Sequence, residues 1–484
     1  MDKSIVFAGD LPAATLSDRV RRGELARLAT GVYTTDVTAD PANVVSREWH
    51  TIAGHMFPDA VISDRSAVTG GPVDGVLYLV HDGRVRQISL PGLVISVRTG
   101  SRPLDGDARL PGGLYQASKG RALTENARPS RSRDGRARRT LDAAELGDWV
   151  DRLCLVDGPE RLSQYREHAE QVAAEVGAPA REVKALSQMI GIALGTQQAA
   201  TASRALAARQ ASLPYDQDRL WLFRQLVRNL RESAPQNRPV RDASQMRYTY
   251  LPFFEAYFSN FIEGTEFELG DAVAIVYGGR QIPGRAEDSH DLLGTYKVVA
   301  DPAEMTTLAA APDEFLQLLR SRHATIMGGR PNKRPGLFKE TANRAGDSLF
   351  VLPGLVAGTL RAGWEELASL DTAFERAVYM MFLVSEVHPF DDGNGRLARV
   401  MMNAELATGG QSRIIVPTVF RDDYLGGLRQ MTRQHESGVL IKALRYAHDY
   451  TARIDFSALP DATDVLRDTN AFNEPSSTDR LRLP

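Results

Sequence analysis

The sequence has almost no cysteine and no long apolar run. Cys154 is the only cysteine among 484 residues, which excludes an intramolecular disulfide and a zinc site built from several cysteines. The longest apolar run, residues 378–384, is far shorter than the roughly 20 residues that cross a bilayer. Neither sign of charge is in large excess, because 58 basic side chains stand against 61 acidic ones. Together with a start that lacks a signal-peptide pattern, these absences predict a cytoplasmic protein without membrane contact.

Length and local composition divide the chain into several regions. About three domains fit a chain of 484 residues. Short helical and β-branched runs mix near the start, whereas apolar residues later recur at three- and four-residue spacing, which predicts a mainly α protein behind a smaller α+β region. A segment between them carries eight basic and two acidic side chains and is typical of a basic linker. The predicted parts are the α+β region 1–118, the linker 119–140, a helical region 141–250 packing on the core, the core domain 251–458 and a polar tail 459–484.

A segment of twelve residues, 388–399 (HPFDDGNGRLAR), carries most of the chemistry. The residue before its proline, His388, ends one helical pattern. Gly393 and Gly395 flank Asn394 at the start of the next helix, where their backbone N–H groups can face an anion. This part of the segment predicts an anion site at a helix N-terminus.

Charged side chains of the same segment suit a polyphosphate. Arg396 and Arg399 are three residues apart, so both guanidinium groups lie on one helix face. Asp392 offers the hard oxygen ligand that Mg²⁺ prefers, and His388 can take a proton near neutral pH. Each feature alone also fits a turn, a cap or a solvated face, but their joint occurrence predicts phosphoryl or nucleotidyl transfer.

The segment resembles the Fic motif, HxFx(D/E)GNGRxxR, at every specified position. Fic proteins are helical enzymes, most of which transfer AMP from ATP to a target hydroxyl. The resemblance implies that His388 deprotonates a Ser, Thr or Tyr hydroxyl, that Phe390 anchors the loop in the core, and that Asp392 holds Mg²⁺. The residues that it implies for nucleotide binding are Gly393, Asn394, Gly395, Arg396 and Arg399.

A second resemblance concerns an inhibitory motif. The stretch from Ser259 through Glu263 to Gly264 is similar to the Fic pattern (S/T)xxxE(G/N), placed before the catalytic motif as in class II members. It implies that Glu263 pairs with Arg399 and occupies the charge that should bind the γ-phosphate. The resting enzyme is then autoinhibited, and the same glutamate could also assist AMP removal. A helix C-terminus with a glycine cap is the structural alternative.

Residues 336–352 are predicted to form a β-hairpin ahead of the motif. This hairpin resembles the Fic flap, which implies that it clamps the target backbone by β-augmentation. An ordinary exposed hairpin is the alternative. The predicted flap residues are Gly336, Leu337, Phe338, Lys339, Ser348, Leu349 and Phe350.

The N-terminal region carries a third resemblance. Residues 16–35 (LSDRVRRGELARLATGVYTT) look like the end of a winged helix and are similar to AbiEi-type antitoxins, a likeness that covers roughly the first 120 residues. The basic side chains that could meet DNA phosphates are Arg19, Arg21, Arg22 and Arg27. A solvated basic face on a protein-interaction module is the alternative.

The sequence predicts a helical Fic domain with a β-hairpin flap behind a winged-helix-like α+β region. We expect a protein adenylyltransferase that uses ATP as substrate and Mg²⁺ as cofactor and acts on a hydroxyl-bearing protein or on itself. DNA and a second copy of the chain stay open as partners. The alternatives are a DNA-binding regulator or antitoxin-like protein whose Fic domain senses nucleotide, a de-AMPylase, and a transferase of UMP or GMP.

Overall fold

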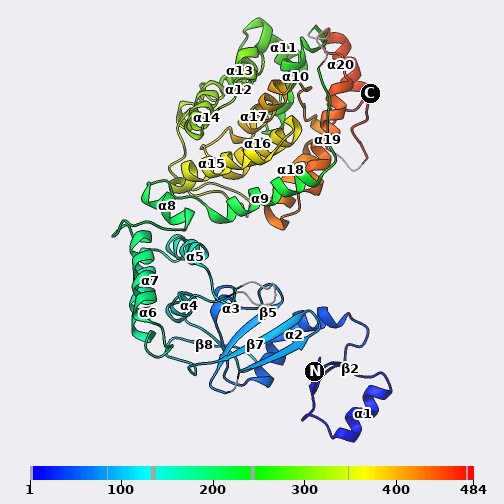
Figure 1. Ribbon diagram of the computed structural model, residues 1–484. Helices are drawn as coiled ribbons and strands as arrows, with labels where there is room; N and C mark the ends of the chain where they lie inside the picture. Colours follow the sequence, from blue (N-terminus) through cyan, green and yellow to red (C-terminus); the bar gives the residue numbers. More distant parts are fainter. Residues whose placement is uncertain (1–3, 84, 132–137, 241–245, 347, 476–477) are drawn as a thin grey trace. The chain divides into compact units, whose positions relative to one another are not determined.

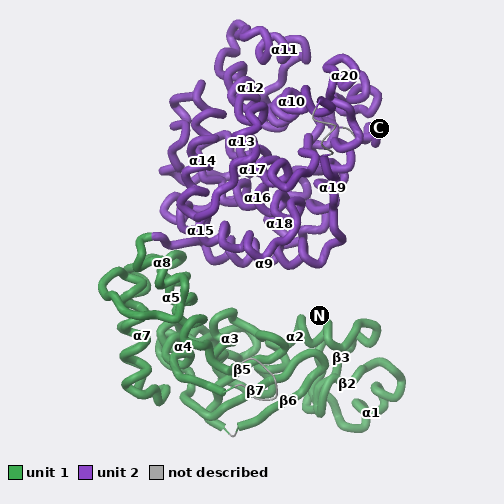
Figure 2. The backbone as a smooth tube through the Cα atoms, turned by 45° about the horizontal axis from the view of Figure 1, so that its top comes forward, with its two compact units in different colours: residues 1–212 green, residues 213–484 purple. Residues whose placement is uncertain are grey.

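The computed structural model describes residues 4–83, 85–131, 138–240, 246–346, 348–475 and 478–484 (Figure 1). The chain divides into two compact units, Met1–Ser212 and Leu213–Pro484 (Figure 2). The first is α+β and the second is almost wholly helical, as predicted. The boundary falls inside the predicted region 141–250, so that region is not one domain. Within the described residues, no helix is long and apolar enough to cross a membrane.

Unit 1 contains two β-sheets. A three-stranded antiparallel sheet has the order β1-β3-β2, and a six-stranded mixed sheet has the order β6-β7-β5-β4-β9-β8. Strands β5 and β7 pair in parallel, with Leu77 opposite Ile95 in a buried core. The strands are β1 Ile5–Phe7, β2 Ala26–Ala29, β3 Val32–Thr34, β4 Val61–Ile62, β5 Val76–His81, β6 Arg86–Leu90, β7 Leu93–Thr99, β8 Ala108–Arg109 and β9 Tyr115–Gln116.

Except for the first two, the helices of unit 1 form a second core beside the mixed sheet. Trp149, Leu162 and Leu186, from three successive helices, pack together with β4. The helices therefore bury their apolar faces within unit 1. They are α1 Ala13–Arg21, α2 Pro41–Met56, α3 Asp64–Thr69, α4 Lys119–Asn126, α5 Ala143–Val156, α6 Pro159–Val172, α7 Ala180–Ala193 and α8 Arg204–Gln210.

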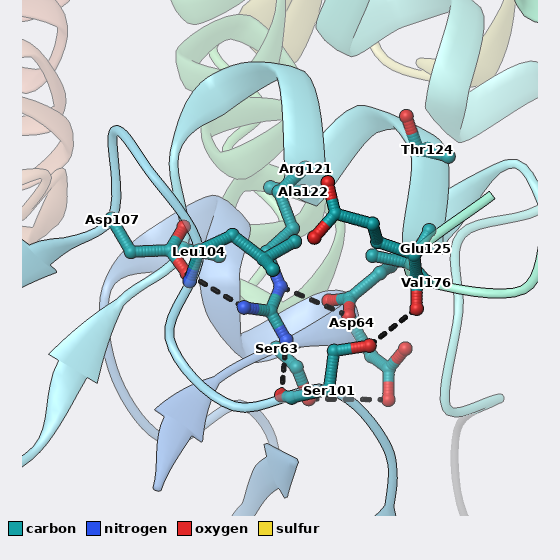
Figure 3. A network of polar contacts seen from close by, with 12 residues as sticks. Ser63, Asp64, Ser101, Leu104, Asp107, Arg121, Ala122, Thr124, Glu125 and Val176 are labelled. Atoms are coloured by element: carbon teal, nitrogen blue, oxygen red, sulfur yellow. Dashed lines mark hydrogen bonds and ion pairs between the residues drawn. The ribbon is translucent and has the colours of Figure 1, made fainter. Parts of the chain in front are cut away.

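Helix α4 corrects the expectation of a basic linker over 119–140. Its Arg121 is fully buried and donates to Asp107 (Nη1 to Oδ2, 2.6 Å) and to Glu125 (Nε to Oε1, 3.3 Å) (Figure 3). It also donates to two backbone carbonyls, those of Ser101 and Arg102. A charge count along the chain misses this compensation, because Asp107 comes from a loop twelve residues upstream of the helix. The central part of the predicted linker, 132–137, lies outside the described residues.

Replacing Arg121 by alanine should lower the stability of unit 1 by about 3–5 kcal/mol. The change leaves Asp107 as a buried carboxylate without its cation, which is the costly way to break a buried ion pair, and removes one of the two arginines that contact Glu125. Urea unfolding of the purified protein measures the effect. Exposed Arg109 is the matched control, since its replacement by alanine should change stability by no more than about 0.5 kcal/mol. Equal midpoints for the two variants would contradict the prediction.

Helix α1 covers only the first part of the stretch 16–35. It stops at Arg21, and most of the rest forms β2 and β3, which pair with each other. Three of the arginines proposed for DNA are engaged locally: Arg21 and Arg22 pair with Asp18, and Arg19 pairs with Glu24. Their positive charge is therefore largely compensated on the protein itself.

Unit 2 is a bundle of helices with one small hairpin. Its helices are α9 Gln217–Glu232, α10 Leu251–Ile262, α11 Leu269–Gly278, α12 Ala286–Val299, α13 Pro302–Thr306, α14 Pro312–Ile326, α15 Val356–Glu365, α16 Ala373–Val387, α17 Asn394–Thr408, α18 Arg421–Gln434, α19 Gly438–Arg453 and α20 Leu459–Asp468. Short 3-10 turns are η2 Pro331–Lys333, η3 Pro353–Leu355, η4 Glu366–Ser369 and η5 Thr418–Phe420. Helix α20 buries Ala462 and Leu466, so the predicted polar tail begins as a packed helix.

The hairpin is shorter than predicted. Its strands are β10 Arg344–Ala345 and β11 Ser348–Leu349, whereas residues 336–340 contain no strand. The first half of the expected hairpin instead bonds to the loop before α17, where the Lys339 N–H donates to the Pro389 carbonyl at 2.9 Å. A tertiary contact thus takes the backbone donor that a longer hairpin would have used.

Helices α16 and α17 form the centre of unit 2 and pack against each other (Figure 1). Helix α16 starts with a capping box between Thr372 and Glu375 and buries most of its length. It ends at His388, which adopts the left-handed conformation (φ 51°) directly before Pro389. Helix α17 begins after Gly393, whose φ of 75° suits glycine. The sequence between these two positions is therefore a tight loop held by two long buried helices.

Candidate active site

His388 lies at the end of α16 with one ring nitrogen engaged. Its Nδ1 lies 3.2 Å from the carbonyl oxygen of Ser385, which favours the tautomer with the proton on Nδ1. Phe350 stacks on the imidazole at 3.9 Å between ring centroids. Burial lowers the pKa of His388 to about 4, and the nearby charge of Lys339 acts in the same direction. The ring is therefore neutral at physiological pH, with Nε2 able to accept a proton.

Phe390 anchors the loop through a histidine that the sequence analysis missed. Phe390 is fully buried and stacks on His323 of α14, with ring centroids 3.7 Å apart. His323 Nδ1 accepts from the Gly336 N–H at 2.9 Å, and its Nε2 lies 2.9 Å from the Asp392 carbonyl. One neutral imidazole thus joins the segment that leads to the hairpin with the catalytic loop.

His323→Phe should keep the stack on Phe390 but remove both polar contacts. We expect a loss of about 1–3 kcal/mol for each backbone group left without a partner, measured by urea unfolding. The folded protein lowers the pKa of His323 to about 4 by burial, so the unfolded chain binds more protons between pH 6.5 and 4. The contribution of His323 to the free energy of unfolding is full above pH 6.5 and is lost as the pH falls toward 4. The variant should therefore lose less stability across that window than the parent; equal losses would contradict the assignment.

Asn394 braces the loop with its side chain. Its Oδ1 accepts from the Phe390 N–H and its Nδ2 donates to the Phe390 carbonyl, both at 2.9 Å. Only the backbone N–H of Asn394 is left for the anion site that the sequence predicts. Gly393 lies against Met327, since an added Cβ would come within 2.6 Å of the Met327 sulfur.

Arg399 is held by the end of α10. Its Nη2 lies 2.7 Å from Glu263 Oε1 and donates to the Ser259 carbonyl at 2.8 Å, while its Nε donates to the Ser259 hydroxyl at 3.0 Å. The Glu263 carboxylate also lies against Gly395, where an added Cβ would meet Oε1 at 2.1 Å. Glu263 ends α10 and is followed by Gly264 at φ 84°. The predicted inhibitory pair is thus in contact, and its carboxylate lies on the predicted anion site.

Arg396 contacts different partners from Arg399. Its Nη1 lies 2.6 Å from Asp291 Oδ2 on α12 and donates to Asn260 at 3.3 Å. Its Nη2 lies 3.8 Å from Asp392 Oδ1. Sequence reasoning did not find Asp291, because a single acid within a helical pattern carries no signal of its partner.

Asp392 fits a magnesium site of the kind that uses substrate phosphates. Its side chain is 40% exposed, and its Oδ1 accepts from the Gly393 N–H at 2.7 Å. Within the described part of the chain, no cluster of three or more histidine, cysteine, aspartate or glutamate side chains could hold a metal ion by itself. One available carboxylate oxygen beside a phosphate site is the arrangement in which Mg²⁺ keeps waters and phosphate oxygens as its other ligands.

A cavity of about 430 Å³ gathers several of these groups. Gly395 and Arg399 of α17 line it together with His388, whereas Arg396 and Asp392 do not. Helix α18 lines another part of the cavity with a mixture of apolar and basic side chains, which the sequence analysis did not identify. The α18 residues at the cavity are Arg421, Tyr424, Leu425, Leu428, Arg429, Thr432 and Arg433.

The predicted flap residues divide into two groups. Leu337 and Leu349 are half exposed, whereas Lys339 is buried and donates through Nζ to Asn343 Oδ1 at 2.6 Å. Burial lowers the pKa of Lys339 to about 8. Phe338 lies near Phe390, with ring centroids 5.3 Å apart.

The hairpin is fastened from two sides. Arg433 of α18 donates to the Ser348 hydroxyl at 3.1 Å, and Arg219 of α9 donates to the Leu349 carbonyl at 2.6 Å. Arg219 also pairs with buried Glu386 at 2.7 Å, two residues before His388. Phe350, directly after the hairpin, therefore covers the histidine, while Leu349 of the hairpin stays half exposed.

Comparison with known proteins identifies relatives of this chain. A sequence model of the Fic/DOC family matches residues 314–406. The protein adenylyltransferase Fic of Nematostella vectensis is 28% identical over 284 residues, which cover 56% of this chain and 62% of that protein. The protein adenylyltransferase fic-1 of Caenorhabditis elegans is 29% identical over 189 residues, covering 38% of this chain and 37% of that protein. The chain thus spans less than two thirds of the length of either relative.

Solved structures give similar matches. Fic-1 of Caenorhabditis elegans aligns with 15% identity and a TM-score of 0.36 over 68% of this chain and 90% of that one. A Fic domain containing signaling protein from Bacteroides thetaiotaomicron aligns with 19% identity and a TM-score of 0.36 over 48% of this chain and 93% of that one. Because the family match includes the loop that carries His388 and Arg399 to the cavity, this chain contains a domain of the Fic/DOC family over residues 314–406.

Proposed function

We propose that this protein transfers AMP from ATP to a Ser, Thr or Tyr hydroxyl of a protein target or of itself. The observation that carries the proposal is that one cavity joins a neutral histidine, a glycine at a helix N-terminus and a buried arginine. These are His388, Gly395 and Arg399. The relatives that bear the name protein adenylyltransferase support the same reaction.

In this reaction His388 acts as the general base. Because Nδ1 faces the Ser385 carbonyl, Nε2 takes the proton from the target hydroxyl. The hydroxyl oxygen attacks the α-phosphorus and forms a new P–O bond. The bond from the α-phosphorus to the bridging oxygen breaks, and pyrophosphate leaves with the electron pair. Arg399 and the N-terminus of α17 stabilise negative charge on the phosphates.

Asp392 would hold a magnesium ion. The ion, when bound, neutralises charge that develops on the leaving group. The Gly393 N–H that bonds to Asp392 Oδ1 fixes the carboxylate at the entrance of α17 and leaves its other oxygen to reach the ion.

Autoinhibition by Glu263 is part of the proposal. Its carboxylate lies 2.7 Å from Arg399 and against Gly395, so it neutralises the cation and fills space at the helix N-terminus that a phosphate would need. A charge-assisted Arg–carboxylate contact at a buried arginine is strong enough to compete with nucleotide. The side chain of Glu263 is 30% exposed, which leaves it free to move aside.

The nucleobase would lie on the α18 side of the cavity. Tyr424, Leu425 and Leu428 offer an aromatic and apolar surface there, and the arginines of α18 add positive charge for the phosphates. The hairpin β10–β11 would receive the target, because its exposed Leu349 directly precedes Phe350, which stacks on His388.

For the N-terminal region, DNA binding is a separate proposal. The family match lies wholly within unit 2, and the likeness of roughly the first 120 residues to AbiEi-type antitoxins stays a prediction. Gel-shift assays of residues 1–484 with DNA at 200 mM salt test it, because specific binding should survive salt that removes phosphate contacts alone. We also propose a cytoplasmic site of action, in keeping with a single unpaired cysteine.

Labelled nucleotide tests the reaction directly. The Glu263→Gly variant is incubated with ATP labelled at the α-phosphate or at the γ-phosphate, with cell lysate as a source of targets. AMP transfer places label on protein from α-labelled ATP only. Label from γ-labelled ATP would indicate phosphoryl transfer, and no label from either would sink the proposed function. Parallel reactions with α-labelled UTP and GTP report the base preference, and loss of label from modified protein reports AMP removal.

A further inference from the structure

Arg396 does not line the cavity, but its Nη2 lies 3.8 Å from Asp392 Oδ1 at the entrance of α17. Its side chain is 4% exposed and is bound through Nη1 to Asp291 Oδ2 at 2.6 Å. Its Nε is buried and has no hydrogen-bond partner among the described residues. A buried guanidinium nitrogen without a partner costs free energy, so an acceptor is expected to reach it in the working complex.

Asp291 is built as a permanent support. It is fully buried in the middle of α12, and the same Oδ2 receives Arg330 Nε at 2.8 Å. The Thr295 hydroxyl donates to the Asp291 carbonyl at 2.8 Å and accepts from Asn260 at 3.2 Å, which fixes α12 against α10. One carboxylate therefore serves two guanidinium groups, Arg330 and Arg396.

Glu263 is placed where its side chain can move, whereas Asp291 is not. Glu263 lies at a helix end beside a glycine and is partly exposed, whereas Asp291 has no exposed surface and no neighbouring hinge. A buried carboxylate that leaves its partners would strand two cations. The Asp291–Arg396 contact is thus expected to persist when nucleotide binds.

We propose that Asp291 is a positioning residue that holds Arg396 by Nη1, so that Nε and Nη2 receive the β-phosphate of the nucleotide. The proposal rests on the proposed function, because it needs a nucleotide at the α17 N-terminus. Arg330 contacts Glu287 and Asp288 as well as Asp291, so Asp291 keeps negative charge with which to hold Arg396.

Nucleotides of different length test the proposal by titration calorimetry. In a Glu263→Gly parent, Asp291→Asn should weaken ATP and ADP at least tenfold and change AMP less than twofold, because AMP has no β-phosphate. Asp288→Asn is the matched control: Asp288 lies one turn earlier on α12 and contacts Arg330 Nη2 at 2.7 Å without reaching the motif. It should leave all three affinities within twofold.

The outcomes separate the roles of Asp291. An equal loss of affinity for ATP, ADP and AMP would indicate that Asp291 is purely structural. Unchanged affinities would show that Asp291 has no role in nucleotide binding. Either result overturns the proposal. If Asp291→Asn does not fold, Asp291→Glu keeps the charge but displaces it by one methylene, and the same ratio of ADP to AMP affinity decides. A parent that binds no nucleotide would instead contradict the proposed function, and the Asp291 proposal with it.

Discussion

Replacing Glu263 by glycine should raise AMP transfer ten- to a hundredfold. The carboxylate now lies 2.7 Å from Arg399 and against Gly395, so its removal frees a buried cation and the N-terminus of α17 at once. A hydrogen bond between charged groups contributes about 1.5–3 kcal/mol, and that much free energy corresponds to the stated range of rates. Incorporation of α-labelled AMP into the protein itself or into lysate proteins measures the increase.

Glu266→Gly is the matched control for this experiment. Glu266 lies three residues further along the chain, is exposed, and has no contact with Arg399 in the described structure. Its replacement tests whether an added glycine in this segment alone changes the rate. Unchanged or lower AMP transfer by Glu263→Gly would contradict autoinhibition by Glu263. A rise of transfer in both variants would instead show that a glycine in this segment raises the rate by making the backbone more flexible.

His388→Ala, made in the Glu263→Gly background, should lower the rate of transfer about a thousandfold. The expectation follows from the usual contribution of a positioned general base. Binding of ATP should change less than twofold, because the imidazole contacts Phe350 and the Ser385 carbonyl and lies on the side of the target hydroxyl. Single-turnover labelling measures the rate, and calorimetry measures the affinity. The exposed His435 serves as control, since its replacement by alanine should leave the rate unchanged.

The pH profile of the Glu263→Gly variant gives an independent check on His388. The base works when it is deprotonated, and burial lowers its pKa from the ordinary 6.5 to about 4. The rate should therefore stay level from pH 8 to about pH 5 and fall below that. An acid limb centred near pH 6.5 would show an imidazole in contact with water and would contradict the geometry under Phe350.

The loop that carries the chemistry could be predicted because its residues are contiguous. Pro389 ends one helix and Gly393 starts the next by local backbone rules, and Arg396 and Arg399 follow within two turns. The pairing of Glu263 with Arg399 was also expected, through its resemblance to an inhibitory motif, although the two residues lie 136 positions apart. The contact agrees with that expectation, while its effect on activity stays a prediction.

Composition is a poor guide where the fold supplies counter-charges. Residues 119–140 are predicted to be a basic linker, yet Arg121 is buried because Asp107 reaches it from a separate loop. The predicted helical region 141–250 is divided between the two units for a similar reason. The apolar faces of α5 to α8 find their partners on α4 and β4, and a helical period does not tell which neighbour a face will choose.

The sequence by itself determined the catalytic loop, its order of residues and the helical class of the unit that holds it, because these depend on short-range backbone rules and a contiguous motif. Only the tertiary structure decided that Asp291 holds Arg396, that His323 joins the catalytic loop to the segment before the hairpin, and that α18 completes the cavity. These contacts depend on how α12, α14 and α18 pack around α17. Such packing is set by the fit of whole helix surfaces, which no local pattern of residues records.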